Sequence, residues 1–117
     1  MLDIYLSNKS LYKNDSLNKS LTTVLSETNE KNFEPRKFVM DKYKNSEELQ
    51  NSKFAQKLGS VLIFTDDNNL KVVDKVMNDE NLYNNSNVVD NLPGIFQKAK
   101  NPDDMDIINK ILENNQP

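Results

Sequence analysis

Residues 59–77 read GSVLIFTDDNNLKVVDKVM, and they contain the clearest secondary-structure pattern in the sequence. A run of four apolar side chains begins at Val61 and lies between a glycine and two aspartates. This pattern favours a strand over residues 60–65 that is buried on both faces. Asp66 or Asp67 is then placed to cap a helix. The apolar positions of that helix recur at helical spacing, at Leu70, Val73, Val76 and Met77. A strand followed by a helix is typical of α/β proteins, so we expect residues 60–65 at the centre of a sheet.

The rest of the chain adds two candidate strands and further helices. Residues 2–6, LDIYL, predict a short strand. Residues 37–43 fit either another strand or a helix that begins at Pro35, and the sequence leaves both open. Further helices are expected over about residues 16–25, 46–59, 92–100 and 102–112. Gly59 would end the second of these in the left-handed conformation. We therefore predict a helix-rich α/β or α+β fold, with a small sheet of two to three short strands packed by four to five helices. It forms a single domain over residues 1–117 without internal repeats.

The apolar side chains at the inward positions of these elements form the predicted core. A chain of 117 residues has the usual size for one such core. The predicted core residues are Leu21, Val24, Leu25, Val61, Ile63, Phe64, Val73, Val76, Phe96, Ile108 and Leu112.

The chain contains neither cysteine nor histidine. Disulfides, thiolate or histidine-ligated zinc sites, and Ser-His-Asp or Cys-His catalysis are therefore excluded. The two glycines, Gly59 and Gly94, are too few for a P-loop or a dinucleotide-binding fingerprint. We expect no cofactor, and the balance of these exclusions favours a protein that is not an enzyme.

Carboxylates leave one enzymatic alternative, a divalent-metal-dependent phosphoesterase or nuclease. Asp66 and Asp67 follow the predicted central strand, and Asp41 joins them if residues 37–43 form a neighbouring strand. Ligands gather at the carboxyl ends of strands in open α/β sheets, and a carboxylate site there would prefer Mg²⁺. An aspartate between a strand and a helix is also an ordinary helix cap, and capping is the interpretation we favour.

Charge is distributed unevenly along this acidic chain, whose net charge is −3 and whose pI is about 4.9. A single arginine and this pI disfavour direct binding to nucleic acid. Residues 1–58 carry ten basic and eight acidic side chains, whereas residues 59–117 carry five basic and ten acidic ones. Asp103, Asp104 and Asp106 begin a predicted helix whose apolar side faces inward, so their carboxylates are expected to face solvent. They are the predicted contact surface for another protein, one that is basic or binds nucleic acid. The alternative is that they serve solubility alone.

The class of function follows mainly from these exclusions. The longest apolar run has four residues, too short to span a bilayer, and Asp3 lies where a secretory signal would carry positive charge. We therefore expect no membrane contact and a cytoplasmic location, in a bacterium or a phage-infected cell. Abundant Asn and Lys indicate an AT-rich genome. The resulting hypothesis is a non-enzymatic binding protein that acts through protein–protein contact, as a phage- or mobile-element-encoded modulator or inhibitor of a host protein. A structural or assembly subunit is the other alternative.

Overall fold

The computed structural model describes residues 1–114, and every regular element in this part of the chain is a helix. The elements are α1 (Leu2–Ser7), α2 (Lys9–Tyr12), α3 (Asp15–Glu27), α4 (Phe33–Lys44), α5 (Glu47–Gln50), the 3₁₀ helix η1 (Lys53–Lys57), α6 (Leu58–Phe64), α7 (Leu70–Met77), α8 (Glu80–Tyr83), α9 (Ser86–Lys98) and α10 (Pro102–Asn114). No strand is present among residues 1–114. The predicted α/β or α+β fold is therefore wrong, because it required a sheet.

All three predicted strands are helical. Residues 2–6 lie in α1, residues 37–43 in α4, and residues 60–65 lie in α6 up to its C-cap. The helix left open for residues 37–43 is the structure that forms, with Pro35 in its first turn. The error at residues 60–65 has a physical cause, because α6 packs between α3 and α9. A helix covered on several sides loses the one-sided apolar pattern, and its sequence then resembles a buried strand.

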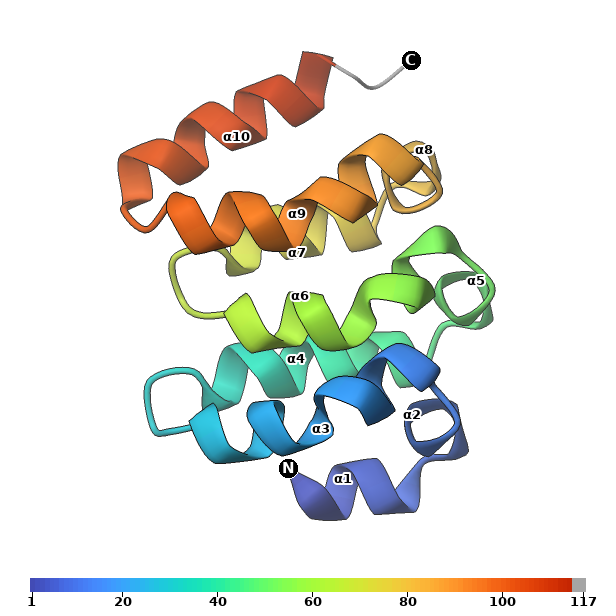
Figure 1. Ribbon diagram of the computed structural model, residues 1–117. Coiled ribbons are helices and arrows are strands. Elements are labelled where there is room, and N and C mark those ends of the chain that lie inside the picture. Colours follow the sequence, from blue (N-terminus) through green and yellow to red (C-terminus); the bar gives the residue numbers. More distant parts are fainter. Residues whose placement is uncertain (115–117) are drawn as a thin grey trace.

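Within the described residues the helices form three consecutive units of the same design (Figure 1). Each unit has a first helix, a one-turn linking helix and a second helix: α1–α2–α3, α4–α5–α6 and α7–α8–α9, with η1 leading into α6. The second helices α3, α6 and α9 pack side by side in one layer, α4 and α7 lie in the layer behind them, and α10 packs against α7 at the end of the stack. The two layers make a stack of 38 × 29 × 19 Å, the arrangement of an α-solenoid.

A short sequence pattern recurs at each linking helix. The third residue of each is a buried leucine: Leu11, Leu49 and Leu82. A polar residue lies three positions before and three positions after each leucine: Asn8, Ser46 and Asp79 before it, and Asn14, Ser52 and Asn85 after it. Four of these side chains accept hydrogen bonds from the helix that they begin: Ser46, Asp79, Asn14 and Asn85. An internal repeat is thus present, contrary to the prediction, because it is confined to caps and one leucine in units of unequal length.

Gly59 holds α3 and α6 close together instead of ending a helix. It lies inside α6, and no residue in the described part of the chain has a positive φ, so the predicted left-handed C-cap is wrong. A Cβ atom at this position would lie 2.3 Å from the carbonyl oxygen of Ser16, and the Gly59 N–H donates to Ser16 Oγ at 3.0 Å. Only glycine therefore fits where the two backbones meet.

The only arginine of the sequence, Arg36, joins the C-terminal ends of α3 and α6. It is 3% exposed, and its guanidinium donates to the carbonyl oxygens of Val24, Ile63 and Thr65 and to the Thr28 hydroxyl. Burial lowers the pKa of the Arg36 guanidinium, while the charges of Glu27 and Asp66 oppose that shift. A cation at the carbonyl ends of two helices is favourable because both helix dipoles are negative there.

The apolar core runs along the stack between its two layers. Six residues of the predicted core are buried: Val24, Val61, Val73, Val76, Phe96 and Leu112. Leu21, Ile63, Phe64 and Ile108 are partly buried against that core, and Leu25 is half-buried. A stack two helices thick leaves such edge positions covered on fewer sides. No helix of the described residues has the length and apolar character needed to cross a membrane.

Candidate binding groove

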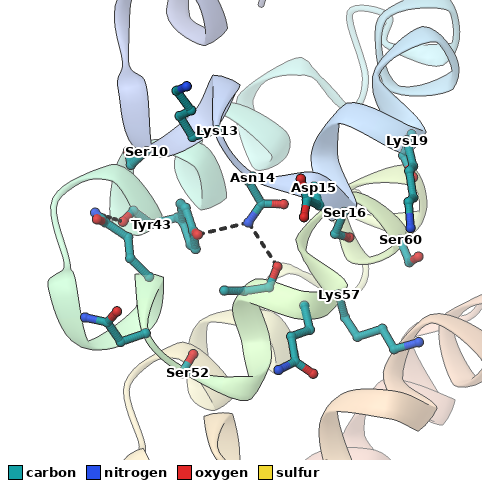
Figure 2. Close-up of a pocket in the computed structure, with 15 residues that line it drawn as sticks. Ser10, Lys13, Asn14, Asp15, Ser16, Lys19, Tyr43, Ser52, Lys57 and Ser60 are labelled. Carbon is teal, nitrogen blue, oxygen red and sulfur yellow. Dashed lines mark hydrogen bonds between the residues drawn. The ribbon is translucent and has the colours of Figure 1, made fainter.

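A polar groove of about 800 Å³ lies between the linking regions of the first two units. Figure 2 shows it between the start of α3 and the segment from α5 through η1. Its walls contain Ser10, Lys13, Asn14, Asp15, Ser16, Lys19, Ser20, Tyr43, Gln50, Asn51, Ser52, Ala55, Gln56, Lys57 and Ser60. Every one of these residues except Ala55 has a polar group on its side chain, so the groove is suited to a hydrophilic ligand.

The floor of the groove is fixed by the amide of Asn14. Its Nδ2 donates to the Tyr43 hydroxyl and to the Ala55 carbonyl, both at 2.9 Å, and its Oδ1 accepts from the Leu17 N–H at 2.8 Å. Asn14 is 8% exposed and Tyr43 is 3% exposed. Burial raises the pKa of the Tyr43 phenol, and the hydrogen bond from Asn14 opposes that shift. These bonds tie α3, α4 and η1 together, so the floor is held in place before any ligand arrives.

A second set of hydrogen bonds shapes the wall that α5 provides. Gln50 Nε2 donates to the carbonyls of Tyr43 and Lys44, both at 3.1 Å, and Ser52 Oγ donates to the Leu49 carbonyl at 2.7 Å. These side chains add hydrogen bonds to carbonyl groups at the ends of α4 and α5. The polar groups of the floor and of this wall therefore serve mainly to hold the groove's shape.

The rim of the groove has several polar side chains that form no hydrogen bond within the protein. Among the described residues, the side chains of Ser10 and Gln56 form no hydrogen bond, and the ammonium groups of Lys13, Lys19 and Lys57 form neither a hydrogen bond nor an ion pair. In Figure 2, Lys19 and Lys57 lie towards one end of the groove and Lys13 towards the other.

Three lysines and one carboxylate line the groove, in a chain whose net charge is −3. The carboxylate is Asp15, in the first turn of α3, where the positive end of the helix dipole favours an acid. The groove is thus a basic site on an acidic protein.

The predicted contact surface of Asp103, Asp104 and Asp106 lies in the first turns of α10, at the end of the stack beyond the third unit. Asp103 and Asp106 are exposed as expected, whereas Asp104 is half-buried. The N–H of Asp104 donates to Asn101 Oδ1 at 3.1 Å, so Asn101 provides the cap of this helix. The three acids lie where the helix dipole stabilises them, which gives them a local structural role.

The three aspartates of the alternative metal site do not form one cluster among residues 1–114. Asp66 Oδ1 accepts from the N–H groups of Asn68 and Asn69 at 2.9 and 3.1 Å, so this carboxylate caps the turn that leads into α7. The Asp41 carboxylate forms ion pairs with Lys37 Nζ at 3.7 Å and with Lys44 Nζ at 3.5 Å, while Asp67 is exposed. Asp41 and Asp67 line one depression and Asp66 lines a different one. No cluster of three or more possible metal ligands occurs among residues 1–114. The sheet edge on which the hypothesis depended is also absent from them.

Sequence reasoning missed the groove because its lysines are far apart along the chain and match no known motif. One signal could have revealed part of it. Lys19 lies five positions after the polar residue Asn14, and Lys57 lies five positions after the corresponding residue Ser52. Recognising the repeat would therefore have placed the two lysines at equivalent positions of neighbouring units.

Comparison of the chain with protein-family models, with curated proteins and with solved structures finds no match.

Proposed function

We propose that this protein is a non-enzymatic binding protein that holds a segment of another protein in the groove between its first two units. One observation carries the proposal: the groove is open and polar, with a floor held by internal hydrogen bonds and a rim of side chains free to bind. A preformed floor lowers the entropy lost on binding, because little of it has to be ordered by the ligand.

The architecture supports a macromolecular ligand. In stacks of helical units each unit contacts only its neighbours, which leaves long surfaces that such proteins use to bind other chains. Sites for small molecules are instead mostly apolar and bury nearly all of the ligand. The polar lining of this groove differs from such a site, and its large volume suits several residues of an extended chain.

The acidic surface of Asp103, Asp104 and Asp106 remains the second candidate for partner contact. Its support is the exposure of Asp103 and Asp106, neither of which forms an ion pair with a described residue. The composition continues to suggest an AT-rich source, and modulation of a host protein is the setting in which we place either contact.

Affinity capture with the wild type and two variants tests the proposal. The immobilised protein is exposed to an extract of the cells that encode it, as wild type, as Gln56→Trp to fill the groove, and as Asn81→Trp as a control. Gln56 and Asn81 are both exposed, and Asn81 lies on α8 outside the groove. We expect one partner to be recovered by the wild type and by Asn81→Trp, and to be lost with Gln56→Trp.

A third variant separates the two candidate surfaces. Lysine at positions 103, 104 and 106 together should leave recovery of the groove's partner unchanged. Loss of the partner with this variant, and equal recovery with Gln56→Trp, would move the function to the acidic start of α10. Thermal melts of all variants check that each is folded.

A further inference from the structure

We infer that the ligand of the groove is an acidic protein segment in extended conformation, whose carboxylates pair with Lys57 and Lys19. The inference rests on the proposed function and adds the chemistry of the partner to it. Two observations support it: the other half-buried lysines form ion pairs with carboxylates, and Lys57 and Lys19 lie at equivalent positions of the repeat.

Lys57 is an exception among the lysines of the described residues. Five of them are half-buried, and four of those five have a carboxylate within 4.0 Å. The four paired lysines are Lys37, Lys42, Lys44 and Lys75. Lys57 is the fifth, and it faces the groove without an ion pair. Opposite charges attract more strongly near a protein surface than in bulk water, so a carboxylate supplied by a ligand is the matching partner.

Lys19 extends this site across the two units. Lys57 is the last residue of η1, directly before α6, and Lys19 lies at the corresponding position of α3. Helices α3 and α6 pack directly against each other, and in Figure 2 Lys19 and Lys57 lie towards the same end of the groove. Alternate side chains of an extended chain lie on one side at about 7 Å, which lets two acids, two positions apart, reach both lysines.

The third unit shows where this basic surface ends. Its corresponding position is Asp90, which is exposed on α9. An acidic segment would therefore be attracted to the first two units and repelled at the third. At the other end of the groove, Lys13 can receive a further acid, and the free amide of Gln56 can bond the backbone of the segment.

The groove is less suited to a nucleic acid strand than to an acidic protein segment. Single strands are held by a basic groove together with aromatic side chains on which bases stack. Tyr43 is the only aromatic side chain that lines the groove, and it is buried with its hydroxyl bound to Asn14. Arg36, the residue best suited to paired phosphate contacts, is buried between helix ends.

Peptide binding to the whole protein tests the inference. The probe is a fluorescent peptide of alternating Glu and Ser residues, and its anisotropy is measured at low and at high salt. Wild-type protein should bind it and lose affinity as salt rises. Lys57→Glu should weaken binding by about tenfold or more, equal to about 1.4 kcal/mol. Lys19→Glu, at an exposed position, should weaken it in the same direction and covers the case in which Lys57→Glu does not fold.

Lys71→Glu is the matched control. Lys71 is exposed on α7, outside the groove, and its reversal changes the net charge by the same amount as the other two variants. Equal loss in all three variants would show general charge attraction and overturn the inference, as would absence of peptide binding by the wild type. An oligonucleotide that binds more tightly than the peptide and depends on the same lysines would replace the acidic segment by a phosphate ligand. If the peptide fails while Gln56→Trp still loses the captured partner, the groove binds a segment of other chemistry and the proposed function stands.

Discussion

Gly59 is the residue at which packing leaves no room for any side chain. The carbonyl group of Ser16 occupies the space that a Cβ would need, so Gly59→Ala must push α3 and α6 apart. We expect it to cost about 1–3 kcal/mol or more of unfolding free energy, the range for overpacked cores. Gly94→Ala is the control, because a Cβ there meets no atom within 4 Å. Inside helix α9 that alanine should stabilise the protein by about 0.5–1 kcal/mol. Urea denaturation measures both, and equal midpoints for the two variants would contradict the close contact.

Tyr43 gives the stability a dependence on alkaline pH. Burial raises its pKa above the ordinary value of 10.0, so the folded state favours the neutral phenol. The unfolding free energy that Tyr43 contributes is therefore fully present below about pH 10, and it is lost as the pH rises through the folded-state pKa. Tyr43→Phe should cost about 1 kcal/mol at neutral pH, because the bond from Asn14 is lost, and should reduce the further fall above pH 10. Part of that fall should remain, since burial and nearby acids also raise the pKa of Tyr83.

Unfolding curves of the wild type and of Tyr43→Phe, recorded from neutral to alkaline pH, measure this difference. Tyr12→Phe, at an exposed tyrosine, controls for loss of a hydroxyl and should change neutral-pH stability by less than about 0.5 kcal/mol. If the unfolding free energy falls equally with rising pH in the wild type and in Tyr43→Phe, the result would count against a buried phenol at the floor of the groove.

Among the helices, α3 and α6 share one cap, because Arg36 binds the C-terminal ends of both. Its planar fork reaches both helices, with Nη2 on the Ile63 carbonyl at 2.7 Å and Nη1 on the Thr28 hydroxyl at 3.0 Å. Arg36→Met leaves the carbonyls of Ile63 and Thr65 without the bonds that the guanidinium donates, and should cost at least about 2 kcal/mol. Arg36→Lys keeps the charge, but one ammonium cannot reach both helix ends, so it should recover little of that loss.

Urea unfolding of both Arg36 variants tests this role. Lys37→Met is the control, because Lys37 forms only a long ion pair, with 3.7 Å between its Nζ and Oδ2 of Asp41, and its loss should change stability by less than about 1 kcal/mol. A wild-type midpoint for Arg36→Lys would mean that charge alone, and not the geometry of the fork, holds the two ends together.

Sequence reasoning succeeded for helices with a clear apolar period and failed where no such period appears, as in α6, which is covered on several sides, and in α1, which has only six residues. The periodic apolar residues of α3, α7 and α10 predicted helices there, and helices are present. The continuous run that begins at Val61 carries no such period, because α6 is covered by helices of both neighbouring units. The one-turn helices α2 and α8 lie outside every predicted helix and strand, since four residues are too few for any periodicity to appear.

The stacking of three helical units explains why the groove could not be found from local sequence motifs. The groove exists only because α3 and η1 come together from separate units, and its lysines belong to different helices. The exclusion of thiol and imidazole chemistry needed only composition and holds for the whole sequence. The groove is basic although the net charge of the chain is negative, so counting charges over the whole chain gave no sign of it.

The stack also predicts how stability varies along the molecule. In a chain of units that contact only their neighbours, an end helix has one side to pack and a central helix has two. Helix α1 has no buried residue, whereas α6 has Leu58, Gly59, Val61 and Leu62 buried. Native-state hydrogen exchange should therefore find the lowest protection in α1, through local opening, and protection equal to the global unfolding free energy in α6.

Gly59→Ala turns this expectation into a sharper test. Because that variant weakens the contact between α3 and α6, the protection of α6 should fall by the same free energy as global stability. The protection of α1 should stay almost unchanged, since its amides exchange by an opening that leaves α3 and α6 packed. Amide exchange followed by NMR in both proteins measures the two regions in one experiment. Equal protection of α1 and α6 in the wild type would show a single cooperative unit in place of a stack that opens from its end.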